Sequence, residues 1–478
     1  MKAETGKTPR HIHFLGIAGI GVSALAQVAQ ARGISVSGSD LSASPEDNPA
    51  MARLLAGGAT IYPNHKTENL ADDVDLVVVT AAVSEENPEI IEARRREIRV
   101  VSRAEFLGEL MAAHPGIKIA VAGTHGKTTT TALLGVMLQS AGLDPTVFVG
   151  GEVPQLGGNV RIGSPSGPFV AEACEAYDSF LQLKPDIAII TNIEADHLDH
   201  YGTERGVYDG FYKFLRGLGT GGVMVPCLDS MGVWQTLAIF NPTEMPKVNG
   251  YAIEDERPES KAIHLDLDRK TAFDWQIKNE TIRINLSVSG RHNVLNALAA
   301  ATVGNLLEVP TAAIVAGLAE FRGAGRRQEI LGEAGGVLVM DDYAHHPTEI
   351  RATLEAMRHA YPTRRIVAVF QPHLFSRTRD FLGEFAFELA KSDALIVTAI
   401  YKARETPIAG VDAADIVELA KKQNKNLAAL YLPDRETIPA LLRTLIRPND
   451  LALFLGAGDI REQGEQFARM LQERNEAR

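Results

Sequence analysis

Short apolar runs alternate with helix-like segments through the first quarter of the chain. The apolar runs lie at residues 12–15, 34–36, 76–79 and 100–101, and the segments between them carry apolar side chains at helical spacing. Short buried strands that alternate with helices are typical of an α/β domain with a mainly parallel sheet. We expect this first domain to end near residue 114, where an Ala-Ala-His-Pro-Gly sequence interrupts the pattern.

Two further series of the same kind follow. The apolar runs of the second lie at residues 118–122, 169–171, 187–190 and 223–225, and those of the third at residues 337–340, 366–370, 395–397 and 451–455. Late in the second series, residues 281–289 alternate strictly between apolar and polar, and residues 262–277 are expected to supply antiparallel neighbours. The pattern therefore predicts three domains, at residues 1–114, 115–323 and 324–478.

The composition limits the classes of function. The 478 residues are 45% hydrophobic and 23% charged, which is typical of a globular protein with a substantial core. The net charge of -12 argues against nucleic-acid binding, which usually requires a basic surface. Only two cysteines are present, Cys174 and Cys227, so a disulfide framework is excluded and a cytoplasmic location is expected.

One uncharged stretch resembles an export signal. Residues 12–31 carry no charge and follow three basic residues, but glycines and polar side chains interrupt the stretch. A buried strand, a glycine turn and an amphipathic helix explain it better. We therefore expect neither export nor a membrane span.

The glycine turn in this stretch has the spacing of a dinucleotide-binding fingerprint. In the sequence Gly16-Ile17-Ala18-Gly19-Ile20-Gly21, Gly16 and Gly21 provide its first and third glycines, Ala18 stands at the second, and Asp40 follows at about the right distance. Such a turn can bind NAD, FAD or a nucleotide sugar, or it can simply pack a helix closely on a strand. The turn alone does not choose among these alternatives.

The strongest local signal is the sequence at residues 123–130, Gly-Thr-His-Gly-Lys-Thr-Thr-Thr, between an apolar strand and a helical run. Backbone N–H groups at such a turn attract phosphate oxygens, Lys127 supplies a positive charge, and the Thr128 hydroxyl can bind Mg²⁺. The spacing departs from the common pattern because Val121 stands where a glycine usually precedes Gly126 by five residues. A purely structural turn is the alternative.

Polar residues also follow later strands of the predicted central sheet. Glu172 ends one strand, and residues 191–197 follow the next and include His197. Both groups reach the carboxyl edge of a parallel sheet, where ligands bind in open α/β folds, so they are candidates to meet Mg²⁺ and the γ-phosphate. Taken singly, such residues are more often solvated or cap a helix.

The third domain repeats this arrangement. Polar clusters at residues 341–347 and 371–379 each follow a strand, which favours a binding site over two unrelated loops. A zinc site is not indicated, because the adjacent His345 and His346 lack the spacing of metal ligands on a helix.

Taken together, these motifs resemble the Mur ligase family across nearly the whole chain. The resemblance rests on residues 16–23, 38–40, 123–130, 172–175, 191–197, 290–296, 326–327, 341–347 and 370–378. It implies an α/β protein of three domains: an N-terminal Rossmann-like domain for a UDP-sugar, a central P-loop ATPase-type domain with antiparallel strands, and a C-terminal Rossmann-like domain for an amino acid.

The resemblance also implies roles for individual residues. The catalytic residues are Lys127, His197 and Arg327, and the metal ligands are Thr128, Glu172 and His197. The ATP-binding residues are Gly123, Thr124, His125, Gly126, Lys127, Thr128, Thr129, His292, Asn293, Asn296 and Asp341. The UDP-sugar-binding residues are Gly16, Gly19, Gly21, Ser23, Ser39 and Asp40, and the amino-acid-binding residues are His345 and Arg377.

Two positions depart from the family pattern. Cys174 replaces an aspartate that many members carry, which affects the surroundings of the metal site. Leu374 replaces an arginine, so recognition of the amino-acid carboxylate rests more on Arg377.

The reaction implied by the resemblance uses ATP as a co-substrate together with Mg²⁺. It joins L-alanine to the lactyl carboxylate of UDP-N-acetylmuramate through an acyl phosphate, in peptidoglycan precursor synthesis. Three alternatives remain at this point: a related ligase that attaches a recycled tripeptide to the same sugar, an NAD-dependent oxidoreductase, and a nucleotide-binding protein without catalysis. The sequence indicates neither the oligomeric state nor the choice among L-alanine, L-serine and glycine.

Overall fold

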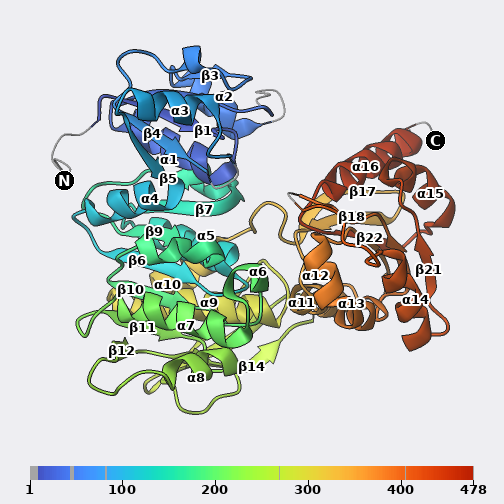
Figure 1. Cartoon of the computed structure of the whole chain (residues 1–478). Coiled ribbons are helices and arrows are strands. Elements are labelled where there is room, and N and C mark those ends of the chain that lie inside the picture. The colour runs from blue at the N-terminus through green and yellow to red at the C-terminus, as the bar shows by residue number, and fades with distance from the viewer. Residues whose placement is uncertain (1–8, 43–47, 81–82, 269, 404, 477–478) are drawn as a thin grey trace. The chain divides into compact units, whose positions relative to one another are not determined.

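The computed structural model of the chain (Figure 1) describes residues 9–42, 48–80, 83–268, 270–403 and 405–476. The chain forms two compact units. The first comprises Met1–Lys261, Gln276–Glu280 and Leu295–Phe321. The second comprises Ala262–Trp275, Thr281–Val294 and Arg322–Arg478.

The first sheet of the N-terminal unit is parallel, with the strand order β3-β2-β1-β4-β5. Its strands are β1 (His11–Leu15), β2 (Ser35–Ser39), β3 (Thr60–Tyr62), β4 (Leu76–Val79) and β5 (Arg99–Ser102). Its helices are α1 (Ile20–Ala31), α2 (Pro49–Ala56), α3 (Pro88–Arg95) and α4 (Arg103–Ala112), and η1 (Thr67–Asn69) is a short 3-10 turn. The order reverses at β1, so the crevice between the carboxyl ends of β1 and β4 is the expected ligand position.

Local sequence explains where these helices begin. Asn87 accepts a hydrogen bond from the backbone of Glu89, and Pro88 occupies the first helical position of α3, where its missing N–H costs nothing. Ser102 and Glu105 form a reciprocal capping box at the start of α4.

The second sheet of this unit has seven strands in the order β12-β11-β10-β6-β9-β7-β8. Its strands are β6 (Lys118–Ala122), β7 (Thr146–Val153), β8 (Gly158–Arg161), β9 (Phe169–Glu172), β10 (Ile187–Ile190), β11 (Val223–Pro226) and β12 (Lys247–Val248). All neighbours are parallel except β7 and β8, which form an antiparallel hairpin that the sequence pattern did not predict. The central strand β6 therefore delivers its carboxyl end to the middle of the sheet.

Helices accompany this second sheet. They are α5 (Lys127–Ser140), α6 (Leu198–Tyr201), α7 (Glu204–Arg216), α8 (Met231–Leu237), α9 (Arg291–Leu306) and α10 (Thr311–Glu320), with 3-10 turns η2 (Pro154–Leu156) and η3 (Ala176–Gln182). Helix α5 is buried along most of its length and packs against α10. Its buried surface is apolar over residues 132–138, whereas its first turn carries Lys127 and threonines.

A separate four-stranded sheet has the order β13-β14-β15-β16. Its strands are β13 (Tyr251–Ala252), β14 (Ser260–Asp266), β15 (Ala272–Ile277) and β16 (Glu280–Asn285). The alternation predicted over residues 281–289 is present, since Ile284 and Leu286 are buried and the residues beside them are exposed. The strand is shorter than predicted, because β16 ends at Asn285.

The six-stranded sheet lies in the C-terminal unit and has the order β17-β18-β22-β19-β20-β21. Its strands are β17 (Glu329–Ala334), β18 (Val337–Asp342), β19 (Arg365–Phe370), β20 (Ala394–Val397), β21 (Ala428–Tyr431) and β22 (Asp450–Leu455). Only β17 is antiparallel to its neighbour. The helices are α11 (Pro347–Ala360), α12 (Phe375–Asp380), α13 (Leu382–Leu389), α14 (Ala414–Gln423), α15 (Ile438–Leu445) and α16 (Ile460–Glu476), with η4 (Arg435–Thr437).

The predicted fold class is confirmed: the chain is an α/β protein with mainly parallel sheets in each predicted third. Residues 12–31 form the end of β1, a glycine turn and α1, as expected. Among the described residues, no helix is both long and apolar enough to cross a membrane. The domain boundaries near residues 114 and 324 stay a prediction.

Candidate functional site

The loop at residues 123–126 connects β6 to α5 at the carboxyl edge of the central sheet. Its two glycines are required by geometry. Gly123 has a φ of 134°, and a Cβ there would lie 2.0 Å from Oγ1 of Thr191. Gly126 has a φ of 80°, and a Cβ there would lie 2.6 Å from Oδ1 of Asn296. Close approach and a left-handed backbone together explain both glycines.

The segment after β10 holds this loop in place. The backbone N–H of Thr124 donates to the carbonyl of Asn192 at 3.0 Å, and the N–H of His125 donates to the Asn192 side chain at 2.9 Å. The Thr191 hydroxyl donates to the carbonyl of His125 at 2.5 Å. The predicted polar segment 191–197 therefore supports the phosphate-type loop directly.

Lys127 begins α5, and its ammonium group is enclosed by acceptors. Its Nζ donates to the carbonyls of Gly123 and Thr124 at 2.5 and 2.9 Å and to Oε1 of Glu175 at 3.0 Å. Burial alone would lower the pKa of Lys127, but the negative charges around it, with Glu175 foremost, outweigh burial and raise the pKa. Lys127 is therefore a cation at neutral pH.

Two of the three predicted metal ligands are in contact. The Thr128 hydroxyl lies 3.3 Å from Oε2 of Glu172, and the other carboxylate oxygen of Glu172 accepts the N–H of Gly150 at 2.5 Å. His197 contacts a neighbouring carboxylate. Its Nε2 lies 3.7 Å from Oε1 of Glu175, the carboxylate that also holds Lys127.

Glu175 is a site residue that sequence reasoning did not assign. It is almost fully buried, and its backbone carbonyl accepts the hydroxyl of Tyr201 at 2.6 Å. Burial next to Glu175 raises the pKa of the Cys174 thiol, which therefore stays protonated at neutral pH. The only sequence signal for Glu175 was its place in the segment 172–175.

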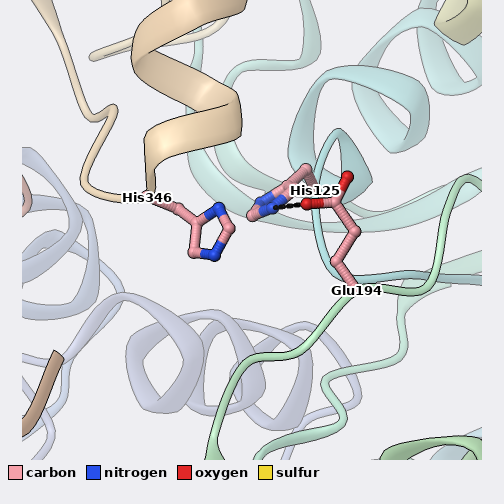
Figure 2. A group of neighbouring side chains, drawn as sticks. All are labelled: His125, Glu194 and His346. Carbon is pink, nitrogen blue, oxygen red and sulfur yellow. Dashed lines mark ion pairs between the residues drawn. The ribbon is translucent and has the colours of Figure 1, made fainter. Parts of the chain in front are cut away.

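His125 and Glu194 face each other beside the loop (Figure 2). Nε2 of His125 lies 3.6 Å from Oε2 of Glu194. The backbone N–H of Glu194 donates to the Thr124 hydroxyl at 2.9 Å. An acidic side chain thus lies next to the phosphate-type loop, where it can orient the imidazole of His125.

Helix α9 contributes the predicted adenine-binding residues. Oδ1 of Asn296 accepts the Thr130 hydroxyl at 3.1 Å, which brings Asn296 against the loop and α5. His292 and Asn293 lie in the first turn of the same helix. Burial, together with the nearby charge of Arg327, lowers the pKa of His292 to about 4, so its imidazole is neutral at neutral pH.

The first sheet carries a cavity of about 360 Å³ at its carboxyl edge. Its lining residues are Gly16, Ala18, Gly19, Asp40, Leu41, Ser42, Asn48, His65, Thr80 and Val83. The carboxylate of Asp40 accepts the N–H of Ala18 at 3.0 Å and the hydroxyl of Ser42 at 2.7 Å. The predicted residues Gly16, Gly19 and Asp40 therefore line one cavity, at the point where the strand order reverses.

The other three residues predicted to bind the UDP-sugar do not line this cavity. Ser23 is buried and accepts a hydrogen bond from Asn159 at 2.9 Å. Gly21 faces the side chain of Arg103 rather than the cavity, and a Cβ on it would lie 2.8 Å from the Arg103 guanidinium. Ser39 lies behind the residues that line the cavity, and its hydroxyl contacts one of them, His65. The sequence did not predict His65 as a site residue.

In the C-terminal unit, Asp341 has no exposed surface. Its Oδ2 lies 3.2 Å from Nε of Arg326 and 3.3 Å from Nη1 of Arg461. Burial raises the pKa of Asp341 although both arginines act against it. The predicted ribose-binding carboxylate thus lies inside an ion-pair cluster of its own unit.

Arg327, which is predicted to contact the γ-phosphate, lies over the ring of Tyr343. Its guanidinium carbon lies 4.9 Å from the ring centre of Tyr343, within cation–π range. The neighbouring Asp342 is buried, which raises its pKa to about 6, and it accepts N–H groups from Gln328 and Ala344. These bonds fix the turn that carries Arg327.

His373 links the two predicted amino-acid-binding residues. The ring of His345 lies 6.0 Å from the ring of His373, and Nη1 of Arg377 lies 3.4 Å from Nδ1 of His373. Nδ1 of His345 lies 2.9 Å from the carbonyl oxygen of Tyr343 and 3.1 Å from Oε2 of Glu349, and these two acceptors orient the ring. Leu374, which precedes α12, has a φ of 71°, an unusual value for a residue with a branched side chain.

Three family models match the chain in order. The Mur ligase family catalytic domain matches residues 11–115, the Mur ligase middle domain matches residues 121–304, and the Mur ligase glutamate ligase domain matches residues 326–458.

Full-length relatives and solved structures agree with these models. A UDP-N-acetylmuramate–L-alanine ligase of Geobacter sulfurreducens is 43% identical over 470 residues, which cover 98% of each chain. The crystal structure of a UDP-N-acetylmuramate-alanine ligase from Thermotoga maritima gives a TM-score of 0.81 at 29% identity and covers 97% of this chain and 99% of that chain. A murein peptide ligase from Psychrobacter arcticus gives 0.72 at 26% identity, with 97% and 98% covered. The chain belongs to the Mur ligase family.

Proposed function

We propose that the chain is an ATP-dependent, ADP-forming ligase that joins L-alanine to the lactyl carboxylate of UDP-N-acetylmuramate, in peptidoglycan precursor synthesis. The observation that carries this proposal is the match, over 98% of both chains, to a relative named for that reaction. The glycine loop with Lys127 supplies a matching phosphate-binding geometry. Because the reaction consumes ATP, we assign it to the cytoplasm.

The chemistry divides into two displacements. An oxygen of the lactyl carboxylate attacks the γ-phosphorus of ATP, which forms an acyl phosphate and releases ADP. The amine of L-alanine then attacks the acyl carbon, phosphate leaves, and the amine gives up a proton. In the first step two anions approach each other, so the site has to neutralise negative charge.

Lys127 and the loop are suited to that task. The raised pKa keeps Lys127 cationic, and α5 directs its N-terminus toward any phosphate in the loop. Arg327 is the second cation that we assign to the γ-phosphate. Domain closure around the substrates would complete the site, as positioning dominates in phosphoryl transfer.

The oxygen donors of Thr128 and Glu172 fit a magnesium ion. Their side-chain oxygens lie 3.3 Å apart at the edge of the loop, and Mg²⁺ prefers oxygen ligands. When bound, Mg²⁺ would offset the charge of the phosphates. His197 is the less usual ligand of the predicted set, and we assign it to the same site through its position beside Glu175.

The amino acid is assigned to the C-terminal unit. His345, His373 and Arg377 form a chain of contacts in which Arg377 offers a cation for the carboxylate of L-alanine. The carbonyl of Tyr343 and the carboxylate of Glu349 hold the ring of His345 in a fixed orientation. Leu374 adds no charge, so Arg377 carries carboxylate recognition among these residues.

A ligase for a ready-made peptide is the second candidate. The similarity to the murein peptide ligase, with a TM-score of 0.72, favours this possibility. The higher identity to the L-alanine ligase argues for the first candidate. An NAD-dependent oxidoreductase gains no support, because the relatives and all three family models are ligases.

The test is a phosphate-release assay with Mg²⁺, ATP and UDP-N-acetylmuramate. L-alanine, L-serine, glycine and the tripeptide are compared as acceptors. We expect ADP, phosphate and the UDP-sugar alanine conjugate to appear only when all substrates are present. A clear preference for the tripeptide would transfer the assignment to the peptide ligase, and nicotinamide turnover would support the oxidoreductase.

A further inference from the structure

A buried polar network lies directly behind the cavity of the first sheet. Its centre is Glu89, in the first turn of α3, whose side chain has no exposed surface. Oε2 of Glu89 accepts the Ser39 hydroxyl at 2.5 Å, and Oε1 accepts Nδ2 of Asn69 at 2.5 Å. Oε1 also accepts the backbone N–H of Lys66 at 3.2 Å. A buried carboxylate with three donors is a costly feature that has to be explained.

The hydrogen bonds determine which protons these groups carry. Burial alone would raise the pKa of Glu89, but the imidazole of His13, whose Nε2 lies 3.6 Å from Oε2, and the hydrogen bonds from Ser39 and Asn69 outweigh burial and lower the pKa to about 2. Glu89 is therefore ionised and can only accept. The single hydroxyl proton of Ser39 is used on Glu89.

This leaves one role for His65. Its Nδ1 lies 2.9 Å from Oγ of Ser39 and 3.5 Å from Oε2 of Glu89. The Ser39 hydroxyl donates its only proton to Glu89, so its Oγ can only accept a hydrogen bond from His65. Nδ1 of His65 must therefore carry the proton. In the neutral ring, Nε2 is then an acceptor. His65 is one of the residues that line the cavity.

We propose that Glu89 is a positioning residue for the nucleotide-sugar: acting through Ser39 and the backbone of Lys66, it holds His65 in the Nδ1–H tautomer, so that Nε2 accepts a hydrogen bond from the bound nucleoside diphosphate. The inference rests on the proposed function in one respect, the identity of the ligand. The arrangement resembles the outer partners that orient a metal-binding histidine, with a ligand hydroxyl or N–H in place of the metal.

The first test needs no substitution. In the full chain labelled with ¹⁵N-histidine, long-range ¹H–¹⁵N spectra above the ordinary pKa of histidine report which ring nitrogen carries the proton. The His65 signals are assigned by their loss in His65→Gln. We expect an Nδ1–H tautomer, and a shift of the Nε2 signal when UDP-N-acetylmuramate is added. An Nε2–H tautomer would overturn the proposal.

A matched pair of serines supplies the second test. Ser37 and Ser39 lie on the same strand, and both are buried. The Ser37 hydroxyl contacts His11 and His13, so it reaches Glu89 through His13, whose Nε2 lies 3.6 Å from Oε2 of Glu89, and not through the path of Ser39 to His65. Ser39→Ala should raise KM for the UDP-sugar about tenfold, the effect of one lost hydrogen bond, with kcat unchanged. Ser37→Ala should change KM less than about twofold.

Equal effects of the two substitutions would reduce the network to a structural role and overturn the proposal. Glu89→Gln adds a donor opposite Ser39, so it should convert His65 partly to the Nε2–H tautomer and raise KM as well. If this variant does not fold, the His65 tautomer measured in the unsubstituted chain still tests the proposal. If the unsubstituted chain binds no UDP-N-acetylmuramate, the proposed function fails, while the tautomer measurement still decides whether Glu89 holds His65 as described.

Discussion

Nζ of Lys127 lies 2.9 Å from Oε2 of Glu175, and both side chains are largely buried. An oppositely charged partner thus accompanies the lysine of the phosphate-type loop. A phosphate that reaches Lys127 competes with Glu175 for the ammonium group. Removing either partner leaves a buried charge without its counter-charge, which destabilises the loop. Because Lys127 is also the predicted phosphate-binding cation, a substitution there affects both stability and function.

We expect Lys127→Ala to reduce turnover by orders of magnitude, since a charge on the transferring phosphoryl group is lost. The substitution also leaves Glu175 buried without its cation, which should destabilise the fold by on the order of 3 kcal/mol. Phosphate release and urea unfolding measure the two effects separately.

The double substitution Lys127→Ala/Glu175→Gln separates them further. Removing the charge of Glu175 should restore most of the lost stability and none of the turnover. Recovered turnover would show that Lys127 acts only as a partner of Glu175 and would remove it from the phosphate site.

Thr128→Val should raise the Mg²⁺ concentration needed for half-maximal turnover by about tenfold, because it removes one oxygen ligand at nearly constant volume. Thr131→Val is a matched control on the same helix. Thr131 is buried, and its hydroxyl has no hydrogen-bond partner among the described residues. Parallel shifts of the Mg²⁺ titration in both variants would contradict the assignment of Thr128.

Gly19→Val should weaken binding of the UDP-sugar strongly. Gly19 lines the cavity and has an ordinary φ of −65°. A Cβ there would lie 3.2 Å from the Gly16 carbonyl, so the turn has to shift by a few tenths of an ångström to admit a side chain that projects toward the ligand. Gly21→Val instead displaces the end of the Arg103 side chain and should have a smaller effect. Calorimetric titrations with UDP-N-acetylmuramate and with ATP would compare the two variants.

Affinity for ATP, measured without the sugar, should change little in either glycine variant, because Lys127 and its loop lie on a different sheet. Loss of ATP binding with normal sugar binding in folded Gly19→Val protein would reverse our assignment of ligands to domains.

Glu89 should make the fold sensitive to acid. The pKa of Glu89 in the fold is about 2, below its ordinary value of 4.5. A lowered carboxyl pKa stabilises the fold above the ordinary value, and this contribution is lost as the pH falls from 4.5 toward 2. Urea unfolding should find Glu89→Gln less stable than the unsubstituted chain by on the order of 2–3 kcal/mol near neutral pH. The difference should shrink at about pH 3, and a constant difference would contradict the role of ionisation.

The sequence by itself determined the local elements. Apolar runs of strand length, helical spacing between them and the glycine turns at Gly16 and Gly123 indicated α/β units with ligand sites at strand ends. These features depend on side chains within a few residues of each other, so periodicity and backbone geometry are enough to predict them. The hairpin of β7 and β8 escaped prediction because glycines at positions 150, 151, 157 and 158 interrupt its apolar pattern.

Only the tertiary structure decided which distant residues meet. Glu175 reaches Lys127 because β9 lies beside β6. Glu89 reaches Ser39 because the first turn of α3, which packs against η1, lies at the carboxyl end of β2. In the C-terminal unit, tertiary packing buries Asp341 between Arg326 and Arg461. Its position after an apolar run had predicted an open ligand site. Strand order and helix packing set these contacts, and both depend on how the whole apolar surface of a domain is buried, which no short stretch of sequence specifies.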